Sequence, residues 1–491
     1  MDKSQIKTQK FIIKYFTEIM IKGDKAKRQM IAQVYNNLVN LLSRISSDIK
    51  LKRFFDKVEI VCPIEYVDLV RTKLLDTPGI EQILEAMQFD NMATLDDIKV
   101  KVNEMMADEI KGKTFVVRAK RTGAQAFKSM DIERTVGGYM LAHNETKGVL
   151  LKNAEVTINL ELEHTQLNII TKKYIGLRGF PIGTQGSILS LMSGGFDSTV
   201  ASYLAMKRGI KTHFIFFNLG GLAHEIGVKQ VAYYLWNKFG SSHRVSFISV
   251  PFDDVVGEIF KSVSQPYMGI MLKRLMLSAS EKIADSMGID AIMTGESVAQ
   301  VSSQTLRNLA LIDQCTNKLV LRPLAMMSKP DIIDIAYKIG TRRFAESMPE
   351  YCGVISKNPV THGSYERIEN EAKAFNYEIL EEAVKKSVFV NVDEIDKDVN
   401  EIGQMEIIED LNGTDYTVID IRQTPDCIKT EVETIKIPFY NLKNEFKKLP
   451  QDKTYLFYCD KGIMSQLHAQ FLRDEQGCTN IKVYRPSKAQ L

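Results

Sequence analysis

Residues 189–198 read LSLMSGGFDS, and this stretch decides the fold of the chain around it. An apolar run ends at Met192, two glycines follow, and the helical pattern STVASYLAMKRG then occupies Ser198–Gly209. In a buried strand followed by a glycine turn and a helix, backbone N–H groups and the helix N-terminus face an anion. The sequence therefore predicts a phosphate-binding loop between a strand and a helix.

The residue types in this loop suit a phosphate. Gly194 and Gly195 let the backbone approach closely, and the hydroxyl groups of Ser193 and Ser198 add donors. Asp197 would repel a phosphate unless it binds Mg²⁺ or orients a donor. Because the SGGxDS spacing differs from the GxxxxGK[ST] pattern, it indicates another class of nucleotide site.

Near-continuous apolar runs alternate with helical segments from Ser187 onwards. Runs of this kind are typical of parallel strands that are covered on both faces. We therefore expect a doubly wound parallel sheet, built from the runs ILSLMSGG, THFIFFNLGG, RVSFISVPF, IDAIMTGES and LVLRPL.

The remaining sequence predicts smaller mixed α/β and α+β domains on both sides of this sheet. An acidic segment with a helical pattern reads as a connector ahead of the last domain. The expected parts are an N-terminal module at 1–60, a second domain at 61–175, the parallel-sheet domain at 176–378, the helical connector at 379–410 and a last domain at 411–491.

The composition is that of a multidomain globular protein. The chain has 491 residues, 44% hydrophobic and 25% charged, and at about 100–200 residues per domain this length implies three or four domains. No run of about 18 apolar residues occurs and no signal sequence is evident, so we expect neither a membrane segment nor secretion. Six cysteines without a CxxC pair argue against a disulfide scaffold or a zinc site, and favour the cytoplasm.

Basic residues are concentrated near the N-terminus. Residues 1–60 hold 13 Lys or Arg against 6 Asp or Glu, which favours a polyanionic partner. In residues 114–140, cations lie near Phe127 in a strand–loop–helix pattern, which suits phosphate contacts and base stacking on RNA. A solvated basic surface is the alternative that the charge leaves open. The candidate RNA-binding residues are Arg118, Lys120, Arg121 and Lys128.

A second reactive centre is predicted near the C-terminus. Residues 455–465 read YLFYCDKGIMS, in which an apolar strand precedes Cys459, a loop and a helical segment. A thiolate at a helix N-terminus is stabilised by backbone N–H groups and the helix dipole. Such a thiolate can accept sulfur as a persulfide, whose outer sulfur is a nucleophile. A buried, inert cysteine is the alternative.

The SGGFDS loop resembles that of the PP-loop ATP pyrophosphatases. Within them, four further stretches look like the tRNA 4-thiouridine synthetases, also called tRNA sulfurtransferases, and the likeness covers nearly the whole chain. It implies a ferredoxin-like module at 1–60, a THUMP domain at 61–175, a PP-loop domain at 176–378 and a rhodanese-like domain at 411–491. The stretches are FFNLGGLAHEIGVKQVA (216–232), MTGESVAQVSSQTLRNL (293–309), RPLAMMSKPDII (322–333) and MPEYCGVISKNP (348–359).

The resemblance implies ATP as a cosubstrate, with Mg²⁺ accompanying the nucleotide. Lys273 would supply positive charge for the phosphates, Gly295 would permit close backbone approach, and Gln304 would offer a donor and an acceptor. Lys329 would neutralise charge as pyrophosphate leaves, and Asp197 is a further candidate catalytic residue. The nucleotide-binding residues implied are Leu191, Met192, Ser193, Gly194, Gly195, Ser198, Lys273, Gly295 and Gln304.

The resemblance also pairs Cys459 with Cys352, which would form a transient disulfide with it during turnover. From the sequence alone, a packed core cysteine is the alternative for Cys352. The implied reaction adenylates O4 of uridine 8 in tRNA and then delivers persulfide sulfur to C4. The implied partners are tRNA, a cysteine desulfurase that reloads Cys459, a sulfur-carrier protein of thiamine thiazole synthesis and a second copy of the chain.

Three alternatives from other functional classes remain at this point. The chain could be a sulfur carrier for thiazole synthesis that uses only its last domain. It could be an amide-forming PP-loop ligase, which is disfavoured because no glutaminase-like domain is apparent and two cysteines would be idle. It could also be a non-catalytic tRNA-binding protein, which is disfavoured because the SGGFDS loop and Cys459 are both intact.

Overall fold

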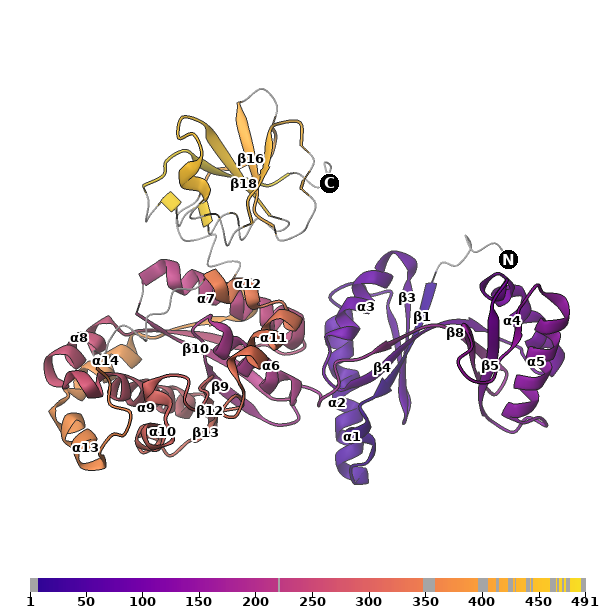
Figure 1. The fold of residues 1–491 in the computed structure, drawn as a ribbon, viewed down its shortest axis with the longest axis horizontal. Coiled ribbons are helices and arrows are strands. Elements are labelled where there is room, and N and C mark those ends of the chain that lie inside the picture. Colours follow the sequence, from indigo (N-terminus) through magenta and orange to yellow (C-terminus); the bar gives the residue numbers. More distant parts are fainter. Residues whose placement is uncertain are drawn as a thin grey trace. The chain divides into compact units, whose positions relative to one another are not determined.

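The structure is a computed structural model in which three β-sheets organise the residues that it describes (Figure 1). Contacts between residues divide the chain near Thr184 into two units, each of which is treated by itself. Among the helices of the residues described below, none is long and apolar enough to cross a membrane. The residues that the structure describes are 8–219, 221–347, 358–395, 405–411, 415–422, 427–428, 430–438, 442, 445–459, 465, 468–469, 472–473 and 477–486.

The N-terminal unit is built on one eight-stranded sheet with the strand order β2-β3-β1-β4-β8-β7-β5-β6. β1 pairs antiparallel with both β3 and β4, while β5 pairs parallel with β6 and β7. Its elements are β1 (Thr8–Tyr15), α1 (Thr17–Met20), α2 (Asp24–Leu42), β2 (Lys50–Arg53), β3 (Lys57–Pro63), α3 (Val67–Leu75), β4 (Ile80–Phe89), α4 (Leu95–Ile110), β5 (Thr114–Thr122), α5 (Ser129–His143), β6 (Gly148–Val149), β7 (Val156–Glu163) and β8 (Gln166–Ile175).

The helices of this unit cover one face of the sheet. On β4, Ile83 packs in the core beneath α2 and α3, whereas Met87 and Phe89 pack in the core beneath α4 and α5. Because alternate residues of a strand point to the same face, both cores lie on the same side. The boundary that we expected between residues 60 and 61 falls inside β3, so the first two expected domains share a single sheet.

A buried ionic cluster occupies the other face. Lys57 of β3 lies 2.7 Å from Glu59 and 2.5 Å from Glu163 of β7, and Lys10 of β1 lies 2.9 Å from Glu59. In the strand order β1, β4 and β8 stand between β3 and β7, so this contact requires a strongly curved sheet. The curvature brings the two halves of the unit together.

The second unit contains the expected parallel sheet, with the order β13-β12-β9-β10-β11-β14. The pairs from β13 to β11 are parallel, which confirms the doubly wound class, and β14 adds an antiparallel edge. The elements are β9 (Ser187–Leu191), α6 (Phe196–Lys207), β10 (Lys211–Asn218), α7 (Gly221–Leu235), β11 (Ser246–Pro251), α8 (Asp253–Ser262), α9 (Met268–Ser286), β12 (Ala291–Met293), α10 (Leu306–Asp313), β13 (Leu319–Leu321), α11 (Lys329–Ile339), α12 (Arg342–Ser347), α13 (Tyr365–Ala374), α14 (Tyr377–Lys385) and β14 (Val388–Asn391).

The strand order locates a ligand site in this sheet. From β9 the chain passes to β10 on one side, and it later returns to β12 on the other side of β9. Ligands of open α/β sheets bind at such a switch point, outside the carboxyl ends of the strands. The SGGFDS loop follows β9 and the residues Thr294–Ser297 follow β12, so both lie at this point.

The segment expected to be an acidic connector belongs largely to this domain. α14 contributes Leu380 and Ala383 to the main hydrophobic core, and β14 pairs with β11. The amphipathic pattern of α14 explains why it is buried, because its apolar residues need a partner. The prediction of a connector over residues 379–410 was therefore wrong for residues 379–391.

A parallel five-stranded sheet lies at the C-terminal end, with the order β15-β19-β18-β16-β17. Its central strand β18 leads directly into Cys459. The strands are β15 (Ile407–Ile408), β16 (Tyr416–Asp420), β17 (Thr434–Lys436), β18 (Thr454–Tyr458) and β19 (Ile481–Tyr484).

Candidate active site

The SGGFDS loop turns sharply between β9 and α6. Gly194 has φ of 81° and is buried, a conformation and a position that favour glycine. Two hydroxyl groups close the loop, since Oγ of Ser198 lies 3.2 Å from Oγ of Ser193 and accepts the backbone N–H of Ser193 at 3.2 Å. Met192, the last residue before the turn, donates its backbone N–H to Ile215 of β10. The loop is thus anchored to the sheet at one end and to α6 at the other.

Gly295 brings the β12 loop against the start of α6. A Cβ atom at this position would lie 2.6 Å from the carbonyl carbon of Asp197 and 2.7 Å from the backbone nitrogen of Ser198. No real Cβ atom sits so close to backbone, so only glycine fits without a shift. The glycine that the sequence associated with nucleotide binding thus packs against the residues of the phosphate loop.

Asp197 is held by a cation and an amide from two other elements. Nζ of Lys329, the first residue of α11, lies 2.8 Å and 3.0 Å from the two carboxylate oxygens. Nε2 of Gln300 donates to one of these oxygens at 2.9 Å. The structure therefore brings two of the predicted catalytic residues into direct contact and adds Gln300, which the sequence analysis missed.

A second charged group lies beside Gly295. Glu296 is buried, and its carboxylate accepts hydrogen bonds from Lys273 at 2.6 Å and from Arg322 at 2.8 Å. Burial alone would raise the pKa of Glu296, but the charges and hydrogen bonds of Lys273 and Arg322 together lower the pKa below its ordinary value. Neither Glu296 nor Arg322 was predicted from the sequence, because nothing in a linear motif identifies which acid faces a given lysine.

The remaining predicted nucleotide residues differ in their surroundings. Gln304 is buried, and its side-chain oxygen Oε1 has no hydrogen-bond partner among the residues that the structure describes. Leu191 is half-buried at the end of β9, and Met192 is buried. A buried amide oxygen without a partner is costly in a folded protein, and a bound ligand can satisfy it.

Cys459 follows the central strand of the five-stranded sheet and is 8% exposed. Its sulfur accepts the backbone N–H of Ser465 at 3.4 Å and lies 3.5 Å from the Ser465 hydroxyl. Ser465 thus contacts the sulfur through both its backbone N–H and its side chain. The intervening residues 460–464 and the predicted partner Cys352 lie outside the described residues.

Asp420 organises the backbone beside this site. Its carboxylate is fully buried and accepts hydrogen bonds from the side chain and backbone of Arg422 and from the backbone of Ile428. Lys436 lies 3.2 Å from the same carboxylate. Burial would raise the pKa of Asp420, but these donors outweigh it and lower the pKa to about 2. The aspartate is thus a fixed anion that holds the ends of β16 and β17.

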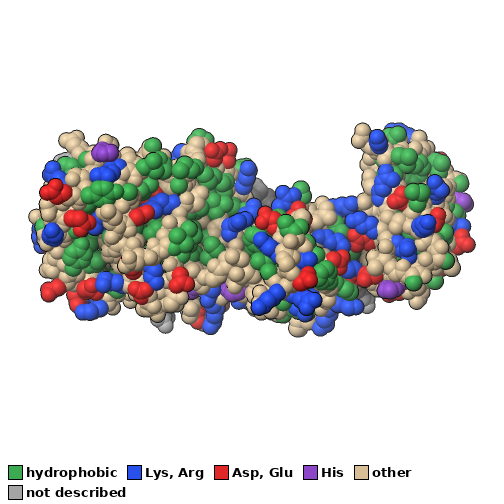
Figure 2. All heavy atoms as spheres, turned by 90° about the horizontal axis from the view of Figure 1, so that it is seen from below, with side chains coloured by type: hydrophobic (Ala, Val, Ile, Leu, Met, Phe, Trp, Pro, Cys, Tyr) green, Lys and Arg blue, Asp and Glu red, His purple; other side chains and the backbone are tan. Residues whose placement is uncertain are grey.

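The four candidate RNA-binding residues fall into two places in the N-terminal unit. Arg118 and Lys120 are exposed at alternate positions of β5, on the face away from the helices, where Arg118 donates to Leu151 at 2.6 Å. Burial lowers the pKa of the neighbouring Lys173, and the charge of Lys120 lowers it further, so these cations share one region. Lys and Arg side chains are also frequent on the face of this unit seen in Figure 2.

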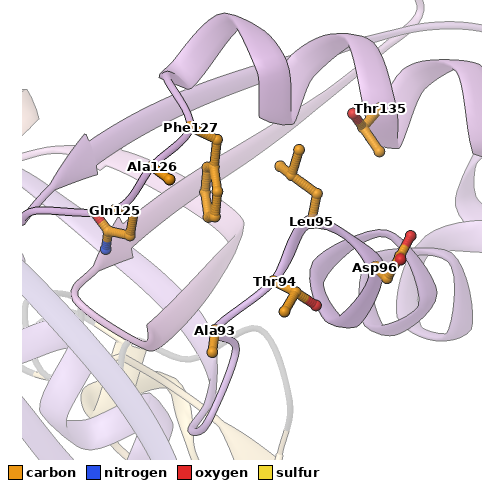
Figure 3. A pocket seen from close by; sticks show the side chains of 8 residues that line it. All are labelled: Ala93, Thr94, Leu95, Asp96, Gln125, Ala126, Phe127 and Thr135. Carbon is orange, nitrogen blue, oxygen red and sulfur yellow. The ribbon is translucent and has the colours of Figure 1, made fainter.

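The other two candidates flank a shallow depression. Lys128 is exposed at the start of α5, and Arg121 donates to Gly123 at 2.6 Å and to Gln125 at 2.7 Å. Figure 3 shows the Phe127 ring and Leu95 pointing into the space between the loop before α5 and the start of α4. The depression has a volume of about 520 Å³ and is lined by Ala93, Thr94, Leu95, Asp96, Gln125, Ala126, Phe127 and Thr135.

Models of three protein families match the chain in the places that the geometry singles out. Residues 92–172 match the THUMP domain and residues 404–487 match the rhodanese-like domain. Residues 183–377, which hold the SGGFDS loop, match the family described as thiamine biosynthesis protein (ThiI). The fold and the two sites thus define a multidomain sulfur-handling protein with a nucleotide loop, a THUMP domain and a rhodanese-like thiol domain.

Curated relatives identify the family within this class of protein. The tRNA sulfurtransferase of Shewanella piezotolerans is 45% identical over 97% of this chain and 100% of its own length. That of Shewanella baltica is 44% identical with the same coverage. The chain therefore belongs to the tRNA sulfurtransferase family and is an enzyme of the transferase class.

Solved structures share the fold of this chain. The crystal structure of a 4-thiouridine synthetase–RNA complex with bound ATP matches with a TM-score of 0.69 and 25% identity, over 78% of this chain and 99% of that chain. The protein PH1313 from Pyrococcus horikoshii shares the fold with a TM-score of 0.53 and 20% identity, over 68% of this chain and 99% of its own.

Proposed function

We propose that this enzyme uses ATP to activate O4 of uridine 8 in tRNA and replaces that oxygen with sulfur carried by Cys459, forming 4-thiouridine. The observation that carries the proposal is the ion pair of Asp197 with Lys329 beside a glycine-lined loop. In the same chain the backbone N–H of Ser465 donates to the sulfur of Cys459. The relative crystallised with RNA and ATP supports the choice of both substrates.

The first step activates the base. O4 of the uracil attacks the α-phosphorus of ATP, and N3 of the base loses its proton to solvent. The bond from the α-phosphorus to the bridging oxygen of the β-phosphate breaks, and pyrophosphate leaves. Lys329 and the N-terminus of α6 stabilise the negative charge that develops on the departing group. Lys273, whose ammonium group Glu296 already fixes, also holds the phosphates.

Asp197 fits a role as the protein ligand of Mg²⁺ that accompanies the nucleotide. Magnesium is usually held by one or two carboxylates together with substrate phosphates and water. The described residues contain no cluster of three or more metal-ligating side chains, so the phosphates would have to complete the coordination. The ion would supply charge neutralisation, while Lys329 and Gln300 set the orientation of the carboxylate.

The second step transfers sulfur. The outer sulfur of a Cys459 persulfide attacks C4, the C4–O4 bond breaks and AMP leaves. The Cys352 thiolate then attacks Sγ of Cys459, which releases the sulfur on C4 as a thiolate, and N3 takes up a proton from solvent to give 4-thiouridine. A cellular thiol reduces the Cys352–Cys459 disulfide that this attack creates. Release of hydrosulfide before the attack on C4 is the variant of this step that the geometry leaves open. A cysteine desulfurase would reload Cys459.

The RNA is proposed to bind the N-terminal unit. Exposed cations on β5 and at α5 would contact phosphates, while Phe127 beside the depression offers a stacking surface for an unpaired base. We also propose that the enzyme acts as a homodimer.

A second role is favoured by the family description of residues 183–377, which names thiamine biosynthesis. The same persulfide would pass sulfur to a carrier protein for the thiazole ring, a step that needs no adenylated RNA. Two variants separate the roles. Asp197→Ala should stop tRNA thiolation and leave persulfide transfer to a carrier intact, whereas Cys459→Ser should stop both.

A further inference from the structure

A chain of four charged residues runs from the surface to the nucleotide site. Asp313, the last residue of α10, accepts two hydrogen bonds from Arg322, at 2.6 Å and 2.9 Å. The Nε atom of Arg322 donates to Oε2 of Glu296, and Oε1 of Glu296 accepts from Lys273 of α9. Each link joins a different element of the domain, so the chain fixes these elements against one another.

Glu296 is the central member of this chain. It is 8% exposed, and the hydroxyl group of Thr294 donates to its Oε2 at 3.0 Å in addition to the two cations. It also follows Gly295 directly, and Gly295 lies against the backbone of Asp197. The buried carboxylate is thus held at a fixed distance from the phosphate loop.

Lys273 is held through one contact. An ammonium group has three donors, and among the described residues Glu296 is the acceptor that takes one of them. The lysine side chain is 21% exposed, so its end is reachable by a ligand. A flexible four-carbon stem would otherwise leave the charge poorly placed.

We propose that Glu296 is a positioning residue that aims Lys273 at the phosphates of ATP, and that Arg322, anchored by Asp313, holds Glu296 in place. This inference rests on the proposed function, because it takes Lys273 as a nucleotide contact. If the cluster only stabilised the domain, removing the charge of Glu296 would change the ATP kinetics equally whether or not Lys273 is present.

A double-mutant cycle separates these two possibilities. The variants are Glu296→Gln, Lys273→Met and the double variant, with Asp290→Asn as the control, since Asp290 is an exposed acid just before β12. The readouts are KM for ATP and kcat of RNA-dependent pyrophosphate release. Glu296→Gln should raise KM by about 10- to 100-fold, the range known for removal of the hydrogen-bond partner that orients a metal ligand. In the Lys273→Met background, adding Glu296→Gln should raise KM by less than about twofold.

A second variant covers the case in which Glu296→Gln fails to fold. Arg322→Lys keeps the charge but loses the fork that grips Asp313. It should give a smaller rise in KM that also disappears with Lys273→Met. Equal effects in both backgrounds, or a normal KM in Glu296→Gln while Lys273→Met is impaired, would overturn the inference. A normal KM in Lys273→Met alone would instead refute the proposed nucleotide role of Lys273, and the inference with it.

Discussion

The ammonium group of Lys329 lies 2.8 Å from one carboxylate oxygen of Asp197 and 3.0 Å from the other, although 132 residues separate them in sequence. The pair joins the first turn of α6 to the first turn of α11 at the switch point of the sheet. A carboxylate held between a lysine and the amide of Gln300 has little freedom to turn. The domain thus presents a preorganised anion and cation where ATP is proposed to react.

Removing the charge of Asp197 should therefore disable the first step. Asp197→Asn keeps the size of the side chain but loses the ion pair and the proposed magnesium ligand. We expect RNA-dependent release of pyrophosphate to fall at least about a hundredfold, in line with the loss of one strong electrostatic contact in a transition state. The control is Asp334→Asn, an exposed acid on α11. Near-normal release by Asp197→Asn would remove this residue from the activation step.

A methyl group at Gly295 should disturb the same site through the backbone. Gly295→Ala places a Cβ 2.6 Å from the carbonyl carbon of Asp197, so the β12 loop or the start of α6 must move. Overpacking of this kind typically costs about 1–3 kcal/mol, and KM for ATP should rise with it. Gly257→Ala in α8 is the matched control, because a Cβ there meets no atom within 4 Å. It should leave KM unchanged and stabilise the protein by up to about 1 kcal/mol. Equal behaviour of the two variants would contradict the packing argument.

Cys459 should be needed for sulfur transfer and dispensable for activation. Cys459→Ser should abolish 4-thiouridine formation while pyrophosphate release continues. Mass spectrometry of the intact protein after incubation with a desulfurase and cysteine should show an added sulfur atom in the native enzyme and none in the variant. Cys427→Ser, at an exposed cysteine, serves as the control and should retain both activities. Persistence of thiolation without Cys459 is the result that the proposal does not allow.

The C-terminal domain should lose stability in acid. The pKa of Asp420 in the folded protein is about 2, below its ordinary value of 3.8. Its ion pairs therefore stabilise the fold at pH values above 3.8, and this stabilisation is lost as the pH falls towards 2. The difference corresponds to about 2 kcal/mol. Hydrogen-exchange protection of the β16 and β18 peptides should fall over this range. In Asp420→Asn the protection should already be low at neutral pH and change little with acid. An unchanged acid response in the variant would assign the effect to another group.

The cations of β5 should contribute to RNA affinity through phosphate contacts. Lys120→Ala should weaken tRNA binding and reduce the slope of log Kd against log salt by about 1 if the residue neutralises one phosphate. Arg118→Ala should do less, because its guanidinium already donates to Leu151 and lies 3.6 Å from Glu133. Lys111→Ala, at an exposed residue beyond the end of α4, provides the comparison. If none of these substitutions alters the dependence of Kd on salt, the RNA-binding surface lies elsewhere.

The sequence predicted the parts of this architecture that depend on local pattern. The loop at 193–198 and the strands around it follow from apolar runs and glycines, so β9 and α6 appear where they were expected. Each of these elements is dictated by residues close together in the chain.

Contacts between residues far apart in the chain could not be predicted from the sequence. Glu296, Gln300 and Arg322 were missed because their roles depend on which charges the folded domain brings together. The predicted domain boundary at residue 60 cut through β3. The strand order β3-β1-β4, which places this strand in the shared sheet, cannot be read from alternating patterns. The connector was misjudged for the same reason, since the burial of α14 in the main core and the pairing of β14 with β11 are contacts between distant parts of the chain.

The most direct test is mass analysis of the nucleosides of tRNA after incubation with the enzyme, Mg-ATP and a persulfide source. The account predicts 4-thiouridine at position 8 with ATP present, and none when ATP is omitted or when Cys459 is serine. Thiolation that proceeds without ATP, or full consumption of ATP and persulfide with no sulfur in the tRNA, would contradict it.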